Sequence, residues 1–120
     1  MTGFHAFVEE LLSGLGPVRI RRMFGGAGVY AGEVMFALID DETLYLKADE
    51  TLKADLVAEG SVGWVYSRAP GKWAETSYWR LPETALDDPD EAVTWARRAL
   101  TAAEAKAPAK RPRRKASKPV

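Results

Sequence analysis

Apolar residues near the amino terminus recur at the spacing of a helix. The Gly-Pro pair at 16–17 ends the pattern, so the predicted helix covers residues 4–15. Because two phenylalanines belong to its apolar stripe, we expect this helix to be buried against a sheet. The stripe consists of Phe4, Phe7, Val8, Leu11, Leu12 and Leu15.

Two further helices are predicted later in the chain. The shorter one starts at Asp49, which can cap it, and stops before Gly60. The longer one follows Asp88, where Pro89 suits the first helical position and Glu91 stands three residues past the cap, as in a capping box. The apolar stripe of the shorter helix is Leu52, Leu56 and Val57, and that of the longer one is Ala92, Val93, Ala96, Ala99, Leu100 and Ala103.

The region between the first two helices has the two-residue alternation of strands. Turn signals at 31–32 and 40–42 separate its segments. Strands so close in sequence pair antiparallel, because a parallel crossover needs about a dozen residues or more. The predicted meander of three or four strands covers residues 18–24, 27–30, 33–39 and 43–48.

Two more strands are predicted after the second helix, at 62–68 and 72–81 around a turn at 69–71. The order is therefore helix, meander, helix, hairpin, helix. Strands that come in runs, without alternating helices, favour an α+β fold with an antiparallel sheet. We expect three helices to cover this sheet.

Four glycines lie beside two arginines between residues 21 and 32, which is a composition typical of phosphate-binding loops. However, Gly25, Gly26 and Gly28 do not have the spacing of a dinucleotide fingerprint, and no Gly-Lys-Ser/Thr tripeptide follows. The next segment is strand-like, so no helix N-terminus supports anion binding. We therefore expect a bulge or tight turn, where glycine permits positive φ or close backbone approach.

These segments together resemble the N-terminal domain of the TfoX/Sxy competence regulators of bacteria. In that family a Met-Phe-Gly-Gly-x-Gly segment leads into a tyrosine, and a Tyr-Trp-x-Leu-Pro segment precedes an acidic turn and a final helix. The resemblance covers roughly residues 4–103. The matching motif positions are Met23, Phe24, Gly25, Gly26, Gly28, Tyr30, Tyr78, Trp79, Leu81 and Pro82.

The resemblance implies an α+β fold of the secretion-chaperone-like type, with no catalytic centre and no cofactor. The full-length regulators act in DNA-uptake competence with an activator of the cyclic-AMP receptor type, and they carry a second, C-terminal domain that this sequence does not match. The expectation is therefore a non-enzymatic regulatory or interaction module with a transcription-related protein partner. Function comes here from association with a family and not from a recognised site.

The formal net charge of zero hides an uneven distribution. Residues 1–104 hold 10 of the 17 Lys/Arg and all 17 Asp/Glu, a formal charge of −7, whereas residues 105–120 carry +7. Dense charge and three prolines predict a disordered basic tail at 105–120, after a folded domain at 1–104. Such a tail binds nucleic acid without sequence preference, or it only solubilises the chain, and composition leaves both open. Its basic residues are Lys106, Lys110, Arg111, Arg113, Arg114, Lys115 and Lys118.

Few residues could support catalysis or metal binding. The absence of cysteine excludes disulfides, thiol catalysis and Cys-ligated zinc. His5 is the single histidine, and we expect it to be a surface polar residue. The acidic clusters at 40–42 and 87–91 could hold Mg²⁺ or Ca²⁺ in principle, but turn and cap roles account for both. We expect no metal and no cofactor.

Aromatic residues concentrate in the predicted hairpin, at Trp64, Tyr66, Trp73, Tyr78 and Trp79. Aromatic rings on a sheet can stack nucleic-acid bases, but such platforms need a basic groove and the folded part is acidic. Burial under the helices, or a dimer interface, is the preferred interpretation. The alternative is a small ligand-binding domain or enzyme with a pocket lined by this cluster.

One basic patch stands out in the folded part, formed by Arg19, Arg21 and Arg22. We expect Arg19 and Arg21 to share a strand face and to pair with the surplus acids. No apolar run reaches the roughly 20 residues of a membrane span, and the N-terminus lacks signal-peptide features. We therefore expect a cytoplasmic protein with no membrane partner. Self-association as a homodimer is a further alternative.

Overall fold

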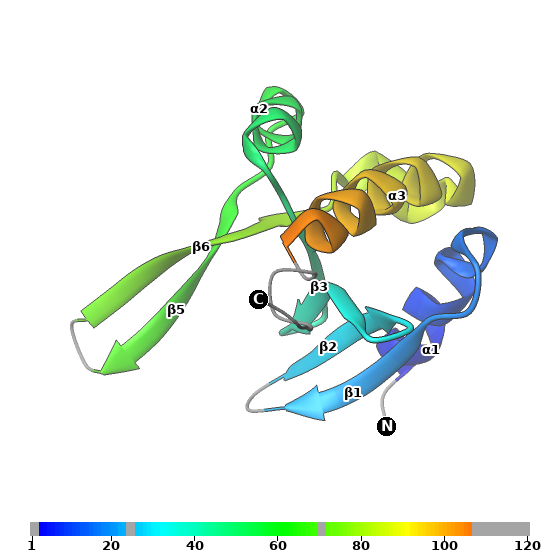
Figure 1. Cartoon of the computed structure of the whole chain (residues 1–120), viewed down its shortest axis with the longest axis horizontal. Coiled ribbons are helices and arrows are strands. Elements are labelled where there is room, and N and C mark those ends of the chain that lie inside the picture. The colour runs from blue at the N-terminus through cyan, green and yellow to red at the C-terminus, as the bar shows by residue number, and fades with distance from the viewer. Residues whose placement is uncertain (1–2, 24–25, 70–71, 107–120) are drawn as a thin grey trace, which may run out of the picture.

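The computed structural model describes residues 3–23, 26–69 and 72–106. Within them, six strands form one antiparallel sheet in the order β1-β2-β3-β4-β6-β5. This arrangement confirms the predicted α+β fold, with a four-stranded meander extended by a hairpin (Figure 1). The elements are α1 (Gly3–Leu11), β1 (Arg19–Met23), β2 (Gly26–Ala31), β3 (Val34–Asp40), β4 (Thr43–Lys47), α2 (Glu50–Ala58), β5 (Gly63–Ala69), β6 (Lys72–Arg80) and α3 (Pro89–Lys106).

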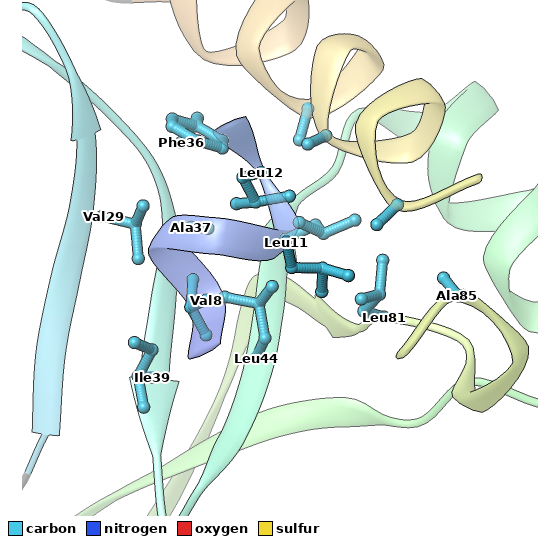
Figure 2. Packing of buried hydrophobic residues seen from close by; sticks show 14 of the residues in the cluster. Val8, Leu11, Leu12, Val29, Phe36, Ala37, Ile39, Leu44, Leu81 and Ala85 are labelled. Atoms are coloured by element: carbon cyan, nitrogen blue, oxygen red, sulfur yellow. The ribbon is translucent and has the colours of Figure 1, made fainter. Parts of the chain in front are cut away.

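All three helices bury residues in the same core cluster. Val8 of α1 and Leu12, which directly follows this helix, belong to one buried cluster with the strand residues Val29 and Ala37 (Figure 2). The cluster also takes in Leu52 and Leu56 of α2, together with the alanine stripe of α3 and Leu44 and Leu46 of β4. Leu38 of β3 is buried but lies outside this cluster. The helices therefore cover one face of the sheet, and Leu38 belongs to the other.

The first helix is shorter than predicted. It ends at Leu11, and a 3₁₀ turn covers Ser13–Leu15, in which the Leu15 N–H donates to the Leu12 carbonyl at 2.9 Å. Two residues of low helix propensity, serine and glycine, fall where the prediction continued the α-helix. Phe4 of the predicted stripe is partly buried against the core, but the expected burial of Phe7 is wrong. Phe7 is 38% exposed and packs on the Phe4 ring with centroids 5.8 Å apart.

The other two helices have the predicted caps. The Asp49 carboxylate accepts the Leu52 N–H at 2.8 Å, but Val57 of the predicted stripe is 48% exposed. The Asp88 carboxylate accepts the N–H groups of Asp90 and Glu91 at 3.1 and 3.2 Å.

The capping box is only half formed, because the Glu91 carboxylate instead accepts from the Thr84 hydroxyl and the Trp95 indole N–H, at 2.9 and 3.1 Å. This carboxylate links the segment before α3 to the second turn of that helix.

Close backbone approach or positive φ accounts for Gly26 and Gly32. A Cβ on Gly26 would stand 2.1 Å from the Ile39 carbonyl oxygen, so strands β2 and β3 need glycine to approach one another there. Gly32 has φ +62° in the turn between β2 and β3. The register shows no bulge at Gly26 and Gly28, where one was expected, but a bulge follows between Val29 and Tyr30. Because Val29 pairs with Ala37 while Tyr30 pairs with Met35, Phe36 is the extra residue, and both Phe36 and Ala37 enter the core.

Parts of the predicted family motif and of the predicted basic tail concern residues that the structure does not describe. Phe24 and Gly25 of the family motif lie outside the described residues, as do Lys110, Arg111, Arg113, Arg114, Lys115 and Lys118 of the tail. Helix α3 ends at Lys106, two residues beyond the predicted domain boundary.

Candidate binding surface on the uncovered sheet face

A row of directly opposed residues crosses five strands on the face away from the helices. It runs from Arg21 in β1 through Gly28, Leu38 and Tyr45 to Arg80 in β6. Opposed residues of antiparallel strands share a face, and Leu38 places this row outside the core cluster. We call this the outer face. Its described residues also include Arg19, Tyr30, Met35, Lys47, Trp64 and Tyr78.

Two arginines of the edge strand β1 converge on one tyrosine. The guanidinium carbons of Arg19 and Arg21 lie 5.8 and 5.9 Å from the ring centroid of Tyr30, within cation–π range. Arg19 also donates to the Gly32 carbonyl at 3.4 Å. The predicted pairing of these arginines with acids is wrong, because neither forms a salt bridge with any described residue. Their guanidinium groups keep most of their hydrogen-bonding capacity.

An aromatic group lies beside this pair, drawn from three strands. The Trp64 ring meets Tyr78 edge to face with centroids 6.4 Å apart, and it lies 6.5 Å from Tyr45. The Trp64 indole N–H donates to the Asp40 carboxylate at 2.9 Å. The Lys47 ammonium lies 5.3 Å from the Tyr78 ring centre and donates to Ser77 at 2.7 Å. The flat faces of these rings are thus partly covered by other side chains.

Desolvation raises the pKa of two phenols of the outer face. Desolvation raises the pKa of Tyr78, and the nearby Tyr30 adds to this rise. Desolvation also raises the pKa of Tyr45, with a further rise from the Asp40 carboxylate that the Arg80 guanidinium partly offsets. A phenol is neutral near pH 7 even at its ordinary pKa of 10.0, so both hydroxyls can donate a hydrogen bond to an anionic partner.

The predicted aromatic cluster is divided between the two faces of the sheet. Trp79 pairs with the buried Leu46 and packs against the core, while the Lys53 ammonium of α2 lies 5.3 Å from its ring centre. Trp64 and Tyr78 lie on the opposite face. The side chains of Tyr66 and Trp73 are outside the described part of the structure. The described aromatic residues therefore do not converge on one pocket.

Three small cavities lie near the end of the sheet where β3 turns into β4. One, of about 250 Å³, is lined by Phe4, His5, Arg22 and Asp41 among others. Another, of about 220 Å³, lies beside Thr43 and Leu44 of β4, and the third, of about 200 Å³, is bordered by Trp64. All three are smaller than the roughly 300 Å³ at which pockets for drug-sized ligands begin.

The acidic clusters have structural roles where the structure describes them. Asp41 and Glu42 form the two-residue turn between β3 and β4, with φ of 53° and 55°, and the Asp88 carboxylate caps α3. Among the described residues, no group of three or more Asp, Glu or His side chains is placed to hold a metal ion.

Several residues of the outer face were not singled out by sequence reasoning. Nothing in the sequence distinguishes Tyr45, Lys47 and Arg80 from other strand positions, and Tyr30 stands out only as part of a motif. Their alternation did place each of them on a strand face, but which faces coincide depends on the register between strands. Arg80 has a further feature, since its buried Nε has no hydrogen-bond partner among the described residues.

No helix in the described part of the chain has the length and apolar character needed to cross a membrane. A search of curated protein sequences gives no significant match. The family model for the TfoX N-terminal domain matches residues 10–103. This match spans the sheet, α2 and nearly all of α3, including Tyr30, Tyr78 and Trp79 of the motif predicted to carry the resemblance. The chain belongs to the TfoX N-terminal domain family.

Proposed function

We propose that this chain is a non-enzymatic regulatory module whose outer face binds a protein partner in a transcription-related process in the cytoplasm. Membership of the TfoX N-terminal domain family supports a regulatory kind of function. The observation that carries the proposal is the arginine pair over Tyr30. Arg19 and Arg21 are held in place by the ring, and neither has a carboxylate partner among the described residues.

Two features favour protein over nucleic acid as the partner of the outer face. Base stacking needs open ring faces, whereas the Tyr30 ring carries two guanidinium groups and Trp64 packs against Tyr45 and Tyr78. The formal charge of −7 over residues 1–104 also repels a phosphate backbone that extends beyond the arginines.

The basic tail supplies a separate affinity for nucleic acid in this proposal. Its charge of +7 within sixteen residues is concentrated and free of acids. Such a segment binds phosphates by releasing counterions, without reading the base sequence. The module would thereby hold its protein partner close to DNA.

Fluorescence anisotropy with duplex DNA tests this division between domain and tail. The intact chain should bind with log K falling against log salt concentration at a slope of about −6, as expected if all seven tail bases contact phosphates. A full-length variant with the seven tail bases replaced by glutamine should not bind. A variant with a shuffled tail of unchanged composition should bind like the parent, because counterion release does not depend on residue order.

DNA binding that is retained by the glutamine-tailed variant would contradict the proposal, because the folded domain itself would then be the nucleic-acid module. Loss of that residual binding in an Arg19→Gln/Arg21→Gln variant would then place the DNA on the outer face.

A further inference from the structure

We propose that the edge strand β1 accepts an extended acidic segment of the partner protein, which continues the antiparallel sheet as a further antiparallel strand. This inference rests on the proposed function, because it specifies how the outer face would engage a protein. It specifies the strand edge at which the partner binds and the chemistry of the bound peptide, whereas the proposed function specifies only a face of the sheet.

Strand β1 is an open edge of the sheet. It pairs with β2 on one side, and four of its five residues are exposed, Ile20 being intermediate. The backbone groups of β1 that point away from β2 form no hydrogen bond with any other described residue. Figure 1 shows β1 at the border of the sheet, next to β2. Such an edge is a template for strand addition.

The side chains of β1 select the chemistry of the added strand. Three of its five residues are arginines, and Arg19 and Arg21 project from the outer face while Arg22, opposite Ala27, projects from the helix face. A second copy of β1 would bring arginines against arginines, which disfavours self-pairing. A strand with carboxylates at alternate positions would instead place them opposite Arg19 and Arg21.

The Tyr30 ring positions the two arginine side chains for contact with carboxylates. It holds both guanidinium groups on the outer face next to the edge, at 5.8 and 5.9 Å. Guanidinium forks match carboxylates in a bidentate geometry, and less side-chain freedom is lost when the forks are already positioned. The acidic strand would therefore satisfy both the open backbone groups and the arginines that lack carboxylate partners.

Amide hydrogen exchange measured by NMR tests the inference with defined peptides. The protein is the full-length chain with the seven tail bases replaced by glutamine, so that the tail cannot attract the peptide. The probe is a capped nine-residue peptide of alternating glutamate and threonine. We expect binding to slow exchange of alternate amides in β1, those that point away from β2, and to leave the β5 edge unchanged.

Two backbone-modified peptides separate strand addition from simple charge attraction. Each carries N-methyl groups at alternate residues, one set on each edge of the extended peptide. With its glutamates on the outer face and an antiparallel direction, only one of the two peptides turns its free N–H groups towards β1, and only that peptide should bind. Both peptides have the same charge, so simple charge attraction would bind them equally. In the protein, Arg21→Gln should weaken binding about tenfold, whereas the control Arg97→Gln, an exposed arginine on α3, should leave it unchanged.

The contrary outcomes overturn either this inference alone or the proposed function with it. Equal binding of both methylated peptides, or binding without protection of β1, would overturn strand addition and leave the proposed protein-binding face standing. Failure of the unmodified peptide to bind would overturn the inference as well. Protection of β1 that rises with protein concentration alone would identify a second copy as the occupant. Protection by a ten-residue oligothymidylate would overturn both this inference and the proposed function.

Discussion

The guanidinium carbon of Arg21 lies 5.9 Å from the centre of the Tyr30 ring. This contact joins an edge strand to its neighbour on the outer face, where an exposed cation–π pair contributes about 0.5–1 kcal/mol. A double-mutant cycle with Arg21→Gln and Tyr30→Leu should therefore give a coupling energy of that size in urea unfolding. The cycle made with Arg97→Gln in place of Arg21→Gln should be additive, and equal coupling in both cycles would contradict the contact.

Gly26→Ala should destabilise the fold strongly. Its Cβ would stand 2.1 Å from the Ile39 carbonyl oxygen, which is backbone and cannot move aside without separating β2 from β3. We expect the free energy of unfolding to fall by about 2 kcal/mol or more, as for overpacked interiors. Gly3→Ala is the control, since no atom lies within 4 Å of the added carbon. Similar unfolding midpoints for the two variants would show that the close approach does not constrain the sheet.

The turn between β3 and β4 stores backbone strain. Asp41 and Glu42 both have positive φ, and Glu42 occupies the position that glycine favours in a two-residue hairpin turn. Glu42→Gly should raise the free energy of unfolding by about 0.5 kcal/mol, because relief of the left-handed strain exceeds the added entropy of the unfolded chain. Glu42→Ala removes the same carboxylate without relieving φ and should give no gain. If alanine stabilises as much as glycine does, charge and not strain is the cause.

The half-buried phenol of Tyr78 should make the fold less stable at alkaline pH. Desolvation raises its pKa above the ordinary 10.0, so the folded chain keeps the proton that the unfolded chain releases. The unfolded state then binds fewer protons, and the free energy of unfolding falls as pH rises from 10 through the folded pKa. Tyr78→Phe should make this fall shallower by up to about 1.4 kcal/mol per pH unit. Urea unfolding at pH 9, 10 and 11 measures the slope, and identical slopes would contradict the shift.

Local patterns predicted the elements of this fold because each depends on neighbouring residues. Asp49 and Asp88 cap their helices through contacts two or three residues away, and Gly32 takes the φ its turn needs. The wrong predictions concern the burial of residues at the edges of the apolar stripes. Phe7 and Val57 sit at the edges of their apolar stripes, where helical spacing does not decide whether another element covers the side chain.

Local sequence patterns could not predict which residues share the outer face. Tyr30, Tyr45 and Tyr78 come from β2, β4 and β6, and they share a face only because of the strand order and the registers between strands. The extra residue Phe36 adds to the difficulty, since a bulge reverses which residues face the helices. For the same reason the five aromatic residues of the hairpin were treated as one cluster, although Trp79 faces the core and Trp64 does not.

The most direct test of the central claim is a titration of the intact, ¹⁵N-labelled chain with duplex DNA, followed by NMR. The claim is that the tail contacts nucleic acid while the outer face is reserved for protein. It predicts that the backbone signals of residues 107–120 shift on addition of DNA and that those of Arg19, Arg21 and Tyr30 stay in place. Shifts at these three residues, with the tail signals unmoved, would contradict it.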